Sequence, residues 1–279
     1  RRGEKQCLHK PDAWNMLYIR QKAQELLHKK LSGKKNRSLI MALTLGDKRG
    51  ISTVLSTRFQ QLGISHLLAL SGMHLGFLCG MLYVSASWLW RRFETLCLLC
   101  PAPHAAGFFM LIFGLMYILL VGAPPSAARA WLMLALWRIS QLAGWHWPIE
   151  IIVLFSFNVF LIVSPFLLYD PGFWLSYAAV FVLISTPNTY RLTAKHHLIY
   201  LGIMWFKTQA KIWLFMLPIC LYFFNQYSLI SPISNAIAIP VVTLIALPLC
   251  LIGMLTLILP LPLSANLSSL CLSLADKTL

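Results

Sequence analysis

The sequence is poor in charged residues, and acidic residues are the scarcest. Only 11% of the 279 residues are charged and just eight are Asp or Glu, whereas 58% are hydrophobic. A soluble domain would be about one quarter charged. An ordinary soluble fold is therefore excluded, and the mean hydropathy of +0.72 indicates that much of the surface faces something other than water.

The sequence also lacks the motifs of motors and metal sites. No nucleotide-binding motif is present, so any motor must be a partner protein. Cys97 and Cys100 form a CxxC with His104 close by, but no second pair of ligands accompanies them. We therefore expect no metal site and no cofactor.

Long apolar stretches are abundant in the rest of the chain. Most of them have roughly 18 residues or more, which is enough to cross about 30 Å of hydrocarbon. We expect an all-α, polytopic transmembrane helical bundle with about 7–9 membrane segments, one of them broken or re-entrant. The expected spanning segments are 66–90, 105–122, 126–145, 149–169, 173–187, 206–225 and 229–260, followed by a short apolar tail over 261–275.

The segment 229–260 is too long for a single crossing. Pro232, Pro240 and Pro248 lie inside it, and proline removes a helical hydrogen bond. We expect two helices or a re-entrant helix, whose freed backbone groups must face protein or a watery path. Asn235 stands near its start and is a candidate for lining such a path.

Positive charge is concentrated before the first spanning segment. Residues 1–60 carry fourteen Lys or Arg against four acids, a net +10 out of +15 for the chain. We expect 1–64 to be a basic, amphipathic juxtamembrane segment and 65–279 to be the transmembrane channel domain. The charge suits an anchor on anionic lipid or a landing surface for nucleic acid. The candidates for contact with DNA are Lys34, Lys35, Arg37, Lys48 and Arg49.

Within the basic segment the sequence predicts three helices. Residues 14–31 repeat apolar side chains at helical spacing, which is typical of an amphipathic helix on a membrane surface or against a bundle. Residues 38–46 and 52–61 predict two shorter helices, the second capped by Ser52.

The stretch SHLLALSGMHLG (65–76) puts polar side chains at the start of the first spanning segment. On a helix, Ser71 and His74 lie on one face. An imidazole at membrane depth is costly unless it meets a partner or a watery cavity. We expect His74 either to line a polar path or to make a structural hydrogen bond. The glycines expected to form a ridge for helix packing are Gly72, Gly76 and Gly80.

Two more charged residues stand where apolar helices are predicted to begin. Arg129, in VGAPPSAARAW, opposes the helix macrodipole, so we expect it to meet a phosphate or a carboxylate, or to snorkel to the interface. Asp170, in YDPGFWLSYAAV, is expected to cap the helix that begins near Phe173. A salt bridge from Asp170 to Arg129 is the sharper hypothesis, because a buried charge usually needs its opposite.

In their order along the chain, these stretches resemble the ComEC competence family. The resemblance implies a multi-pass channel of the bacterial inner membrane that passes single-stranded DNA into the cytoplasm during natural transformation. It also implies, as partners, single-stranded DNA, membrane lipid, other competence proteins and a separate cytoplasmic ATPase motor. The stretches that carry it are ALTLGDKRGIS (42–52), SHLLALSGMHLG (65–76), PSAARAWLM (125–133), DPGFWLSYAAV (170–180) and NAIAIPV (235–241).

The sequence shows neither the oligonucleotide-binding barrel nor the metallo-β-lactamase-like domain of the full-length family. We expect these domains to be further partners of the chain. Two alternatives to a DNA channel stay open. A secondary transporter for a small solute would suit a broken helix. An intramembrane enzyme would use Ser71 and His74 as nucleophile and base, but no orienting acid accompanies them, and we expect no enzymatic activity.

Overall fold

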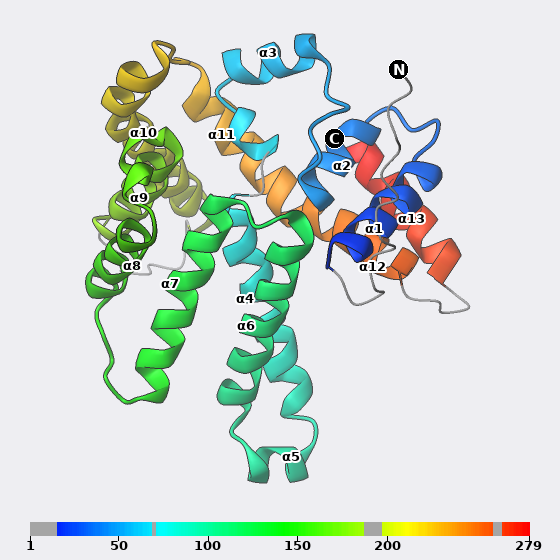
Figure 1. Cartoon of the computed structure of the whole chain (residues 1–279), viewed down its shortest axis with the longest axis vertical. Coiled ribbons are helices and arrows are strands. Elements are labelled where there is room, and N and C mark those ends of the chain that lie inside the picture. Colours follow the sequence, from blue (N-terminus) through cyan, green and yellow to red (C-terminus); the bar gives the residue numbers. More distant parts are fainter. Residues whose placement is uncertain (1–15, 69–70, 187–196, 259–263) are drawn as a thin grey trace, which may run out of the picture.

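The computed structural model is helical throughout the ranges that it describes, which are residues 16–68, 71–186, 197–258 and 264–279. The expected all-α fold is confirmed. Residues 14–15, 69–70, 187 and 259–263 of the predicted segments lie outside these ranges. The helices (Figure 1) are α1 (Met16–Lys30), α2 (Arg37–Leu45), α3 (Thr53–Gln61), the 3₁₀ turn η1 (Ser65–Leu68), α4 (Gly72–Trp90), α5 (Glu94–Leu99), α6 (Ala102–Val121), α7 (Pro125–Leu142), α8 (Ile149–Val163), η2 (Pro165–Tyr169), α9 (Pro171–Ile184), α10 (His197–Phe224), α11 (Ser231–Pro240), the π-helical turn η4 (Val241–Ala246), α12 (Leu247–Ile258) and α13 (Ser264–Thr278).

A long hairpin of α4 and α6 extends away from the rest of the molecule, with α5 at its tip (Figure 1). Helices α7 to α10 lie on one side of it, and α1, α2, α12 and α13 lie on the other. Among the spanning candidates from α4 to α11, each helix packs on the next one along the chain. They therefore alternate in direction, as in an up-and-down bundle.

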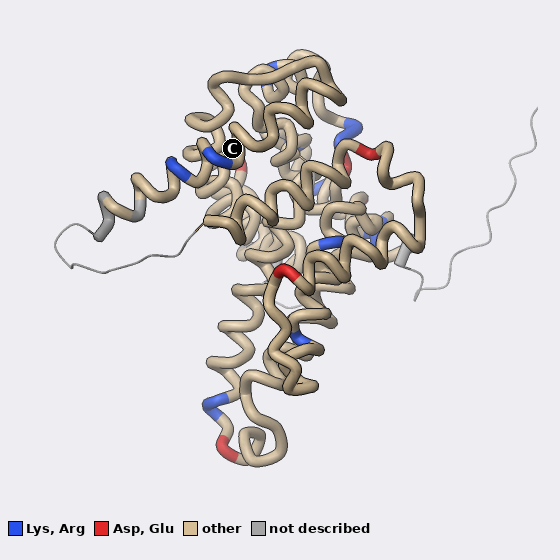
Figure 2. The backbone as a smooth tube through the Cα atoms, turned by 90° about the vertical axis from the view of Figure 1, so that its left-hand side faces the viewer, with Lys and Arg blue, Asp and Glu red and all other residues tan. Residues whose placement is uncertain are grey.

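The outside of the hairpin is apolar. Phe108, Phe113 and Met116 of α6 are each at least 50% exposed. Figure 2 shows charged segments at the tip of the hairpin, where the chain turns from α4 to α6. A surface of this kind suits lipid rather than water, so the protein is a membrane protein.

Three helical runs in the described ranges are long and apolar enough to cross a membrane. They are α4, α6 and the run from Ser231 to Leu257, while α8 and α9 are shorter apolar helices. Arginines in α7 and lysines in α10 reduce the apolar character of those two helices. The total of seven to nine membrane segments stays a prediction.

The last long apolar segment is continuous, so the expected broken or re-entrant helix is wrong. Helices α11, η4 and α12 follow one another directly as one run of 27 residues. After Pro240 the backbone widens into the π-helical turn Val241–Ala246, which accommodates the proline without ending the helix. Pro232 lies in the first turn, where its missing N–H is not needed.

The two N-terminal helices are part of the hydrophobic core. Ala23 and Leu27 of α1, and Leu31 just after it, are at most 1% exposed and belong to the core cluster with side chains of α6 and α12. Helix α2 is buried from Leu39 to Leu45. The amphipathic helix thus lies against the bundle, one of its two expected positions. The domain boundary at residue 64 stays a prediction, although packing runs across it.

Asp276, in the C-terminal helix α13, holds the start of α2. The backbone N–H of Asn36 donates to Asp276 Oδ1 at 2.8 Å, and Asn36 Nδ2 donates to the Asp276 carbonyl at 2.8 Å. A carboxylate at this position also interacts favourably with the helix dipole. The two ends of the chain are therefore joined at the start of α2.

Replacing Asp276 with alanine is expected to lower the free energy of unfolding by about 1–2 kcal/mol, because it removes a helix cap and leaves the Asn36 N–H without its acceptor. Asp276→Asn keeps an acceptor oxygen and is expected to cost less. Thermal unfolding of the purified protein in detergent measures both changes. Unchanged unfolding of the alanine variant would contradict the capping role.

Candidate polar site at the helix N-termini

The first turns of α4, α7 and α9 meet at one end of the bundle. These three helices run in the same direction, because each is separated from the next by one helix of opposite direction. A Cβ on Gly72 of α4 would lie 3.0 Å from Ala130 Cβ of α7. Arg129 of α7 in turn bonds to Gly172 of α9. We call this meeting point the N-terminal junction; it comprises residues 71–75, 125–129 and 170–173.

Ser71 caps α4 and does not lie inside it. Its backbone is extended (φ −89°, ψ 158°), and its Oγ accepts the backbone N–H of His74 at 3.2 Å. The helix predicted from residue 66 therefore begins at Gly72, after the separate turn η1. Ser71 and His74 do not form a nucleophile–base pair in this structure, because neither ring nitrogen of His74 has a hydrogen-bond partner among the described residues.

His74 is a buried imidazole without a protein partner. It is 0% exposed, and neither Nδ1 nor Nε2 has a hydrogen-bond partner among the residues the structure describes. A buried polar group in this condition costs about 1–3 kcal/mol. Of the two roles expected for His74, the structural hydrogen bond is therefore not seen in the described ranges. A water or a passing ligand would satisfy the ring nitrogens.

The predicted glycine ridge is correct for Gly72 only. No atom lies within 4 Å of where a Cβ would stand on Gly76 or Gly80. The two later glycines therefore face open space and take no part in close helix packing. The close approach of α4 and α6 uses Gly114 of α6 instead, where a Cβ would lie 3.0 Å from Cys79 Sγ.

Arg129 lies at the centre of the N-terminal junction. It is 1% exposed, its Nη2 donates to the Gly172 carbonyl at 2.8 Å, and its Nε donates to Ser176 Oγ at 3.1 Å. Its guanidinium carbon lies 5.6 Å from the ring centre of Phe173, within cation–π range. Snorkelling to the interface is therefore wrong, because the side chain is directed at α9.

Asp170 does not pair with Arg129. Its Oδ1 accepts the backbone N–H of Gly172 at 3.0 Å, which confirms the predicted cap of α9. The sharper hypothesis of a salt bridge between Asp170 and Arg129 is wrong, because no ion pair joins these two described residues within 4 Å. The cap holds the carboxylate on α9's own backbone, and Arg129 bonds to neutral acceptors.

Arg129 therefore makes no close ion pair with a carboxylate among the described residues, although the charge of Asp170 acts on it from a greater distance. Arg129 Nη1 is buried and makes no hydrogen bond with the described residues. The starts of α7 and α9 add the partial positive charge of helix N-termini. Such an arrangement favours an anion, and phosphate oxygens match both the charge and the donors of a guanidinium.

Two polar residues with contacts inside the bundle were missed from the sequence. Ser176 follows Gly172 by four positions and so shares its helix face, a signal that the quoted stretch 170–180 contained. Arg138 is 4% exposed; its Nη2 donates to the Pro103 carbonyl at 2.5 Å, and its Nη1 donates to Gln141 Oε1 at 2.8 Å. A second arginine in an apolar helix was the signal for it.

Asn235 has no contact with the N-terminal junction that the structure identifies. Its Nδ2 donates to Ser231 Oγ at 3.0 Å, and its Oδ1 is buried without a partner in the described ranges. The loop before it is held elsewhere, since Ser228 Oγ donates to the carbonyl of Gln61, the last residue of α3, at 2.6 Å. Pro240 frees the Ala236 carbonyl next to Asn235, and that carbonyl accepts the Trp205 Nε1–H at 3.1 Å.

The five basic residues proposed to contact DNA do not form one patch. Lys34 and Lys35 precede α2 and Arg37 begins it, whereas Lys48 and Arg49 follow its other end. The eight residues of α2 that follow Arg37 are buried or half-buried, and they separate the two groups by roughly 12 Å at the usual helical rise. The sequence neighbours therefore form two separate basic groups.

Comparisons with known proteins agree with the resemblance seen in the sequence. The family model described as competence protein matches residues 43–279. ComE operon protein 3 of Bacillus subtilis is 33% identical over 78% of this chain and 26% of its own length. The uncharacterized protein YcaI of Escherichia coli is 27% identical over 78% of this chain and 29% of its length. Competence protein ComA of Neisseria gonorrhoeae is 29% identical over 77% of this chain and 30% of its length.

The chain thus spans about a quarter to a third of the length of the curated relatives that it matches. No solved structure matches it. Because the family match covers nearly all residues from the end of α2 onward, the chain belongs to the competence protein family.

Proposed function

We propose that this chain is the membrane channel part of a competence protein and passes single-stranded DNA across the bacterial inner membrane during natural transformation. The family match over residues 43–279 carries this proposal. Relatives named for competence support a role in DNA uptake, and the apolar helices suit a multi-pass location in that membrane.

The N-terminal junction supplies the chemistry that a passing strand needs. Each nucleotide brings a phosphate, which in a low-dielectric interior needs positive charge and hydrogen-bond donors. Arg129 offers a guanidinium whose Nη1 is unused by the described protein, and His74 offers an unpartnered imidazole. Both side chains are fully buried, so they serve a path or its frame inside the bundle rather than the lipid surface.

Movement of the strand is expected to depend on partners. The sequence contains no nucleotide-binding motif, so the proposal includes a separate cytoplasmic ATPase motor and other competence proteins. The oligonucleotide-binding barrel and the metallo-β-lactamase-like domain of the full-length family complete the machinery. The chain itself is proposed to carry out no enzymatic step, consistent with the use of Ser71 Oγ as a helix cap.

The alternative of a secondary transporter rested on a broken helix. The run from Ser231 to Leu257 is continuous, so the unwound backbone that binds substrates in such transporters is not found there. No specific observation favours this alternative.

Deletion of the gene in a competent host tests the proposal. We expect duplex DNA to reach the periplasm as before, while its passage into the cytoplasm stops and returns when the full-length protein is restored. Periplasmic DNA is scored by nuclease protection and cytoplasmic DNA by the number of transformants. Normal numbers of transformants without the protein would contradict the proposal.

A further inference from the structure

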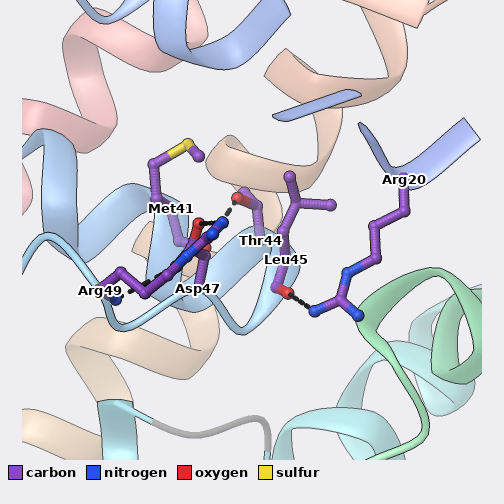
Figure 3. Close-up of polar contacts among 6 residues, drawn as sticks. All are labelled: Arg20, Met41, Thr44, Leu45, Asp47 and Arg49. Atoms are coloured by element: carbon purple, nitrogen blue, oxygen red, sulfur yellow. Dashed lines mark hydrogen bonds and ion pairs between the residues drawn. The ribbon is translucent and has the colours of Figure 1, made fainter. Parts of the chain in front are cut away.

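An open cavity lined by polar residues lies between α1 and the loop after α2. Figure 3 shows three residues of its lining, Arg20, Asp47 and Arg49. Its volume of about 440 Å³ falls in the usual range of small-molecule sites, roughly 300–1,000 Å³. Its lining consists of Arg20, Gln21 and Gln24 from α1 and of Gly46, Asp47, Lys48 and Arg49 from the loop.

The cavity adjoins the turn that leads into the helix of Arg129. A Cβ on Gly46 would lie 2.9 Å from Val121 Cγ1, and a Cβ on Gly122 would collide with Arg20 Nη1. Gly46 and Gly122 both have positive φ (68° and 98°), so the backbone turns tightly at each place. The cavity therefore stands at the C-terminal end of α6, a short connection away from the first turn of α7.

The cavity carries a positive charge that its own residues only partly balance. Asp47 is paired with Arg49, through Oδ1 to Nε at 2.9 Å and Oδ2 to Nη2 at 2.7 Å (Figure 3). Hydrogen bonds from Arg49 lower the pKa of Asp47, so the pair persists at neutral pH and is lost only as the pH falls through that lowered value. The charges of Arg20 and Lys48 are left over, a net +2.

These two cations keep donors available. Arg20 Nη2 donates to the Leu45 carbonyl at 3.3 Å, but its Nε is buried without a partner in the described ranges. Lys48 is exposed, and its ammonium meets no acceptor among the described residues. Charge-assisted donors of this kind are the ones that bind phosphate oxygens most strongly.

The lining also indicates which part of a nucleic acid fits. It contains no aromatic ring, and base recognition on a single strand depends on aromatic stacking. It offers no apolar channel for a lipid chain either, unlike the groove between α9 and α10, which Phe181, Leu214 and Phe215 line. The side chains thus match a phosphate group on a polar ligand.

We infer that the cavity of Arg20 and Lys48 binds a backbone phosphate of the single strand, without regard to base sequence, beside the turn between α6 and α7. This inference rests on the proposed function. It adds Arg20 to the residues that contact DNA and assigns Lys48 a role that Lys34 and Lys35, at the other end of α2, do not share. Asp47 limits the affinity by holding Arg49.

Binding of a fluorescent oligothymidylate to the full-length protein in neutral-lipid nanodiscs tests the inference. Lys48→Gln is expected to weaken binding roughly fivefold, the effect of one charge contact. It is also expected to reduce the slope of log K against log salt by about 0.7. Asp47→Asn keeps an acceptor for the Arg49 backbone N–H but frees its guanidinium, so it is expected to tighten binding. Lys35→Gln is the matched control, an exposed lysine expected to have no effect.

Equal losses for Lys48→Gln and Lys35→Gln would overturn the inference, because they would show a diffuse charge effect. A second pair of results would also overturn it. If vesicles with anionic lipid compete for the site, and an oligonucleotide with uncharged methylphosphonate links binds as well as the charged one, the ligand of the cavity is a lipid headgroup. The two proposals fail separately. If the variants bind DNA as the original protein does but deletion still stops import, only the phosphate site in the cavity is disproved. If import is normal after deletion, the proposed channel function is disproved.

Discussion

Arg129→Met is expected to leave the protein folded and in the membrane while DNA import falls to the level of a strain without the protein. The buried guanidinium makes no close ion pair among the described residues, and the charge of Asp170 acts on it only from a greater distance. A buried charge without a close partner costs several kcal/mol. Methionine of similar length removes that cost while losing two hydrogen bonds of about 1.5–3 kcal/mol each. Stability should therefore change little, whereas the positive charge of the N-terminal junction disappears.

The matched control for this prediction is Arg138→Met in the same helix. Arg138 is also buried, but it bonds to Pro103 at the start of α6 and lies at the far end of α7 from the N-terminal junction. We expect it to retain DNA import if the protein reaches the membrane. Counting transformants and measuring membrane protein by immunoblot separates the two variants. Normal import by Arg129→Met would remove Arg129 from the proposed path.

Gly107→Ala is expected to destabilise the protein by about 3–5 kcal/mol, combining overpacking with the loss of buried hydrogen bonds. A Cβ at this position would overlap Arg138 Nε and lie 2.8 Å from its Cζ. Arg138 cannot move away freely, because Pro103 and Gln141 hold its guanidinium. Unfolding in detergent with increasing denaturant measures the loss.

Two further variants test the cause of this loss. Gly80→Ala in α4 has no atom within 4 Å of the new methyl group and is expected to be neutral or to gain up to about 1 kcal/mol from helix propensity. The double variant Gly107→Ala with Arg138→Ala should be less destabilised than the sum of its single variants, because they share one contact. Strict additivity would show that the clash is not the cause.

Features that depend on neighbours in the chain were predictable from the sequence. Ser52 accepts the Leu55 N–H at 3.3 Å and Asp170 accepts the Gly172 N–H at 3.0 Å, as predicted, because a helix cap involves residues two or three positions apart. The all-α class followed from long apolar stretches, since only helices satisfy their own backbone within such a segment.

Features that depend on what packs opposite were not predictable. Gly72 and Gly80 belong to one sequence pattern, yet only Gly72 has a helix against it. The prolines of the last segment indicated a break, but Pro232 lies in the first helical turn and one π-helical turn follows Pro240. The five basic residues looked like one patch in the sequence. They lie at opposite ends of α2, whose residues from Leu39 to Leu45 are buried in the core.

The sequence by itself determined that this chain is a helical membrane protein of the competence type, with its polar residues at the starts of helices, because apolar length, local caps and ordered motifs are properties of the chain alone. Only the tertiary structure decided what those residues meet. Arg129 bonds to α9, 43 positions away, rather than to a carboxylate, and Arg20 shares a cavity with Lys48. Contacts between residues so distant in sequence depend on how the helices pack. That packing is determined by all the helices together and not by any one stretch of sequence.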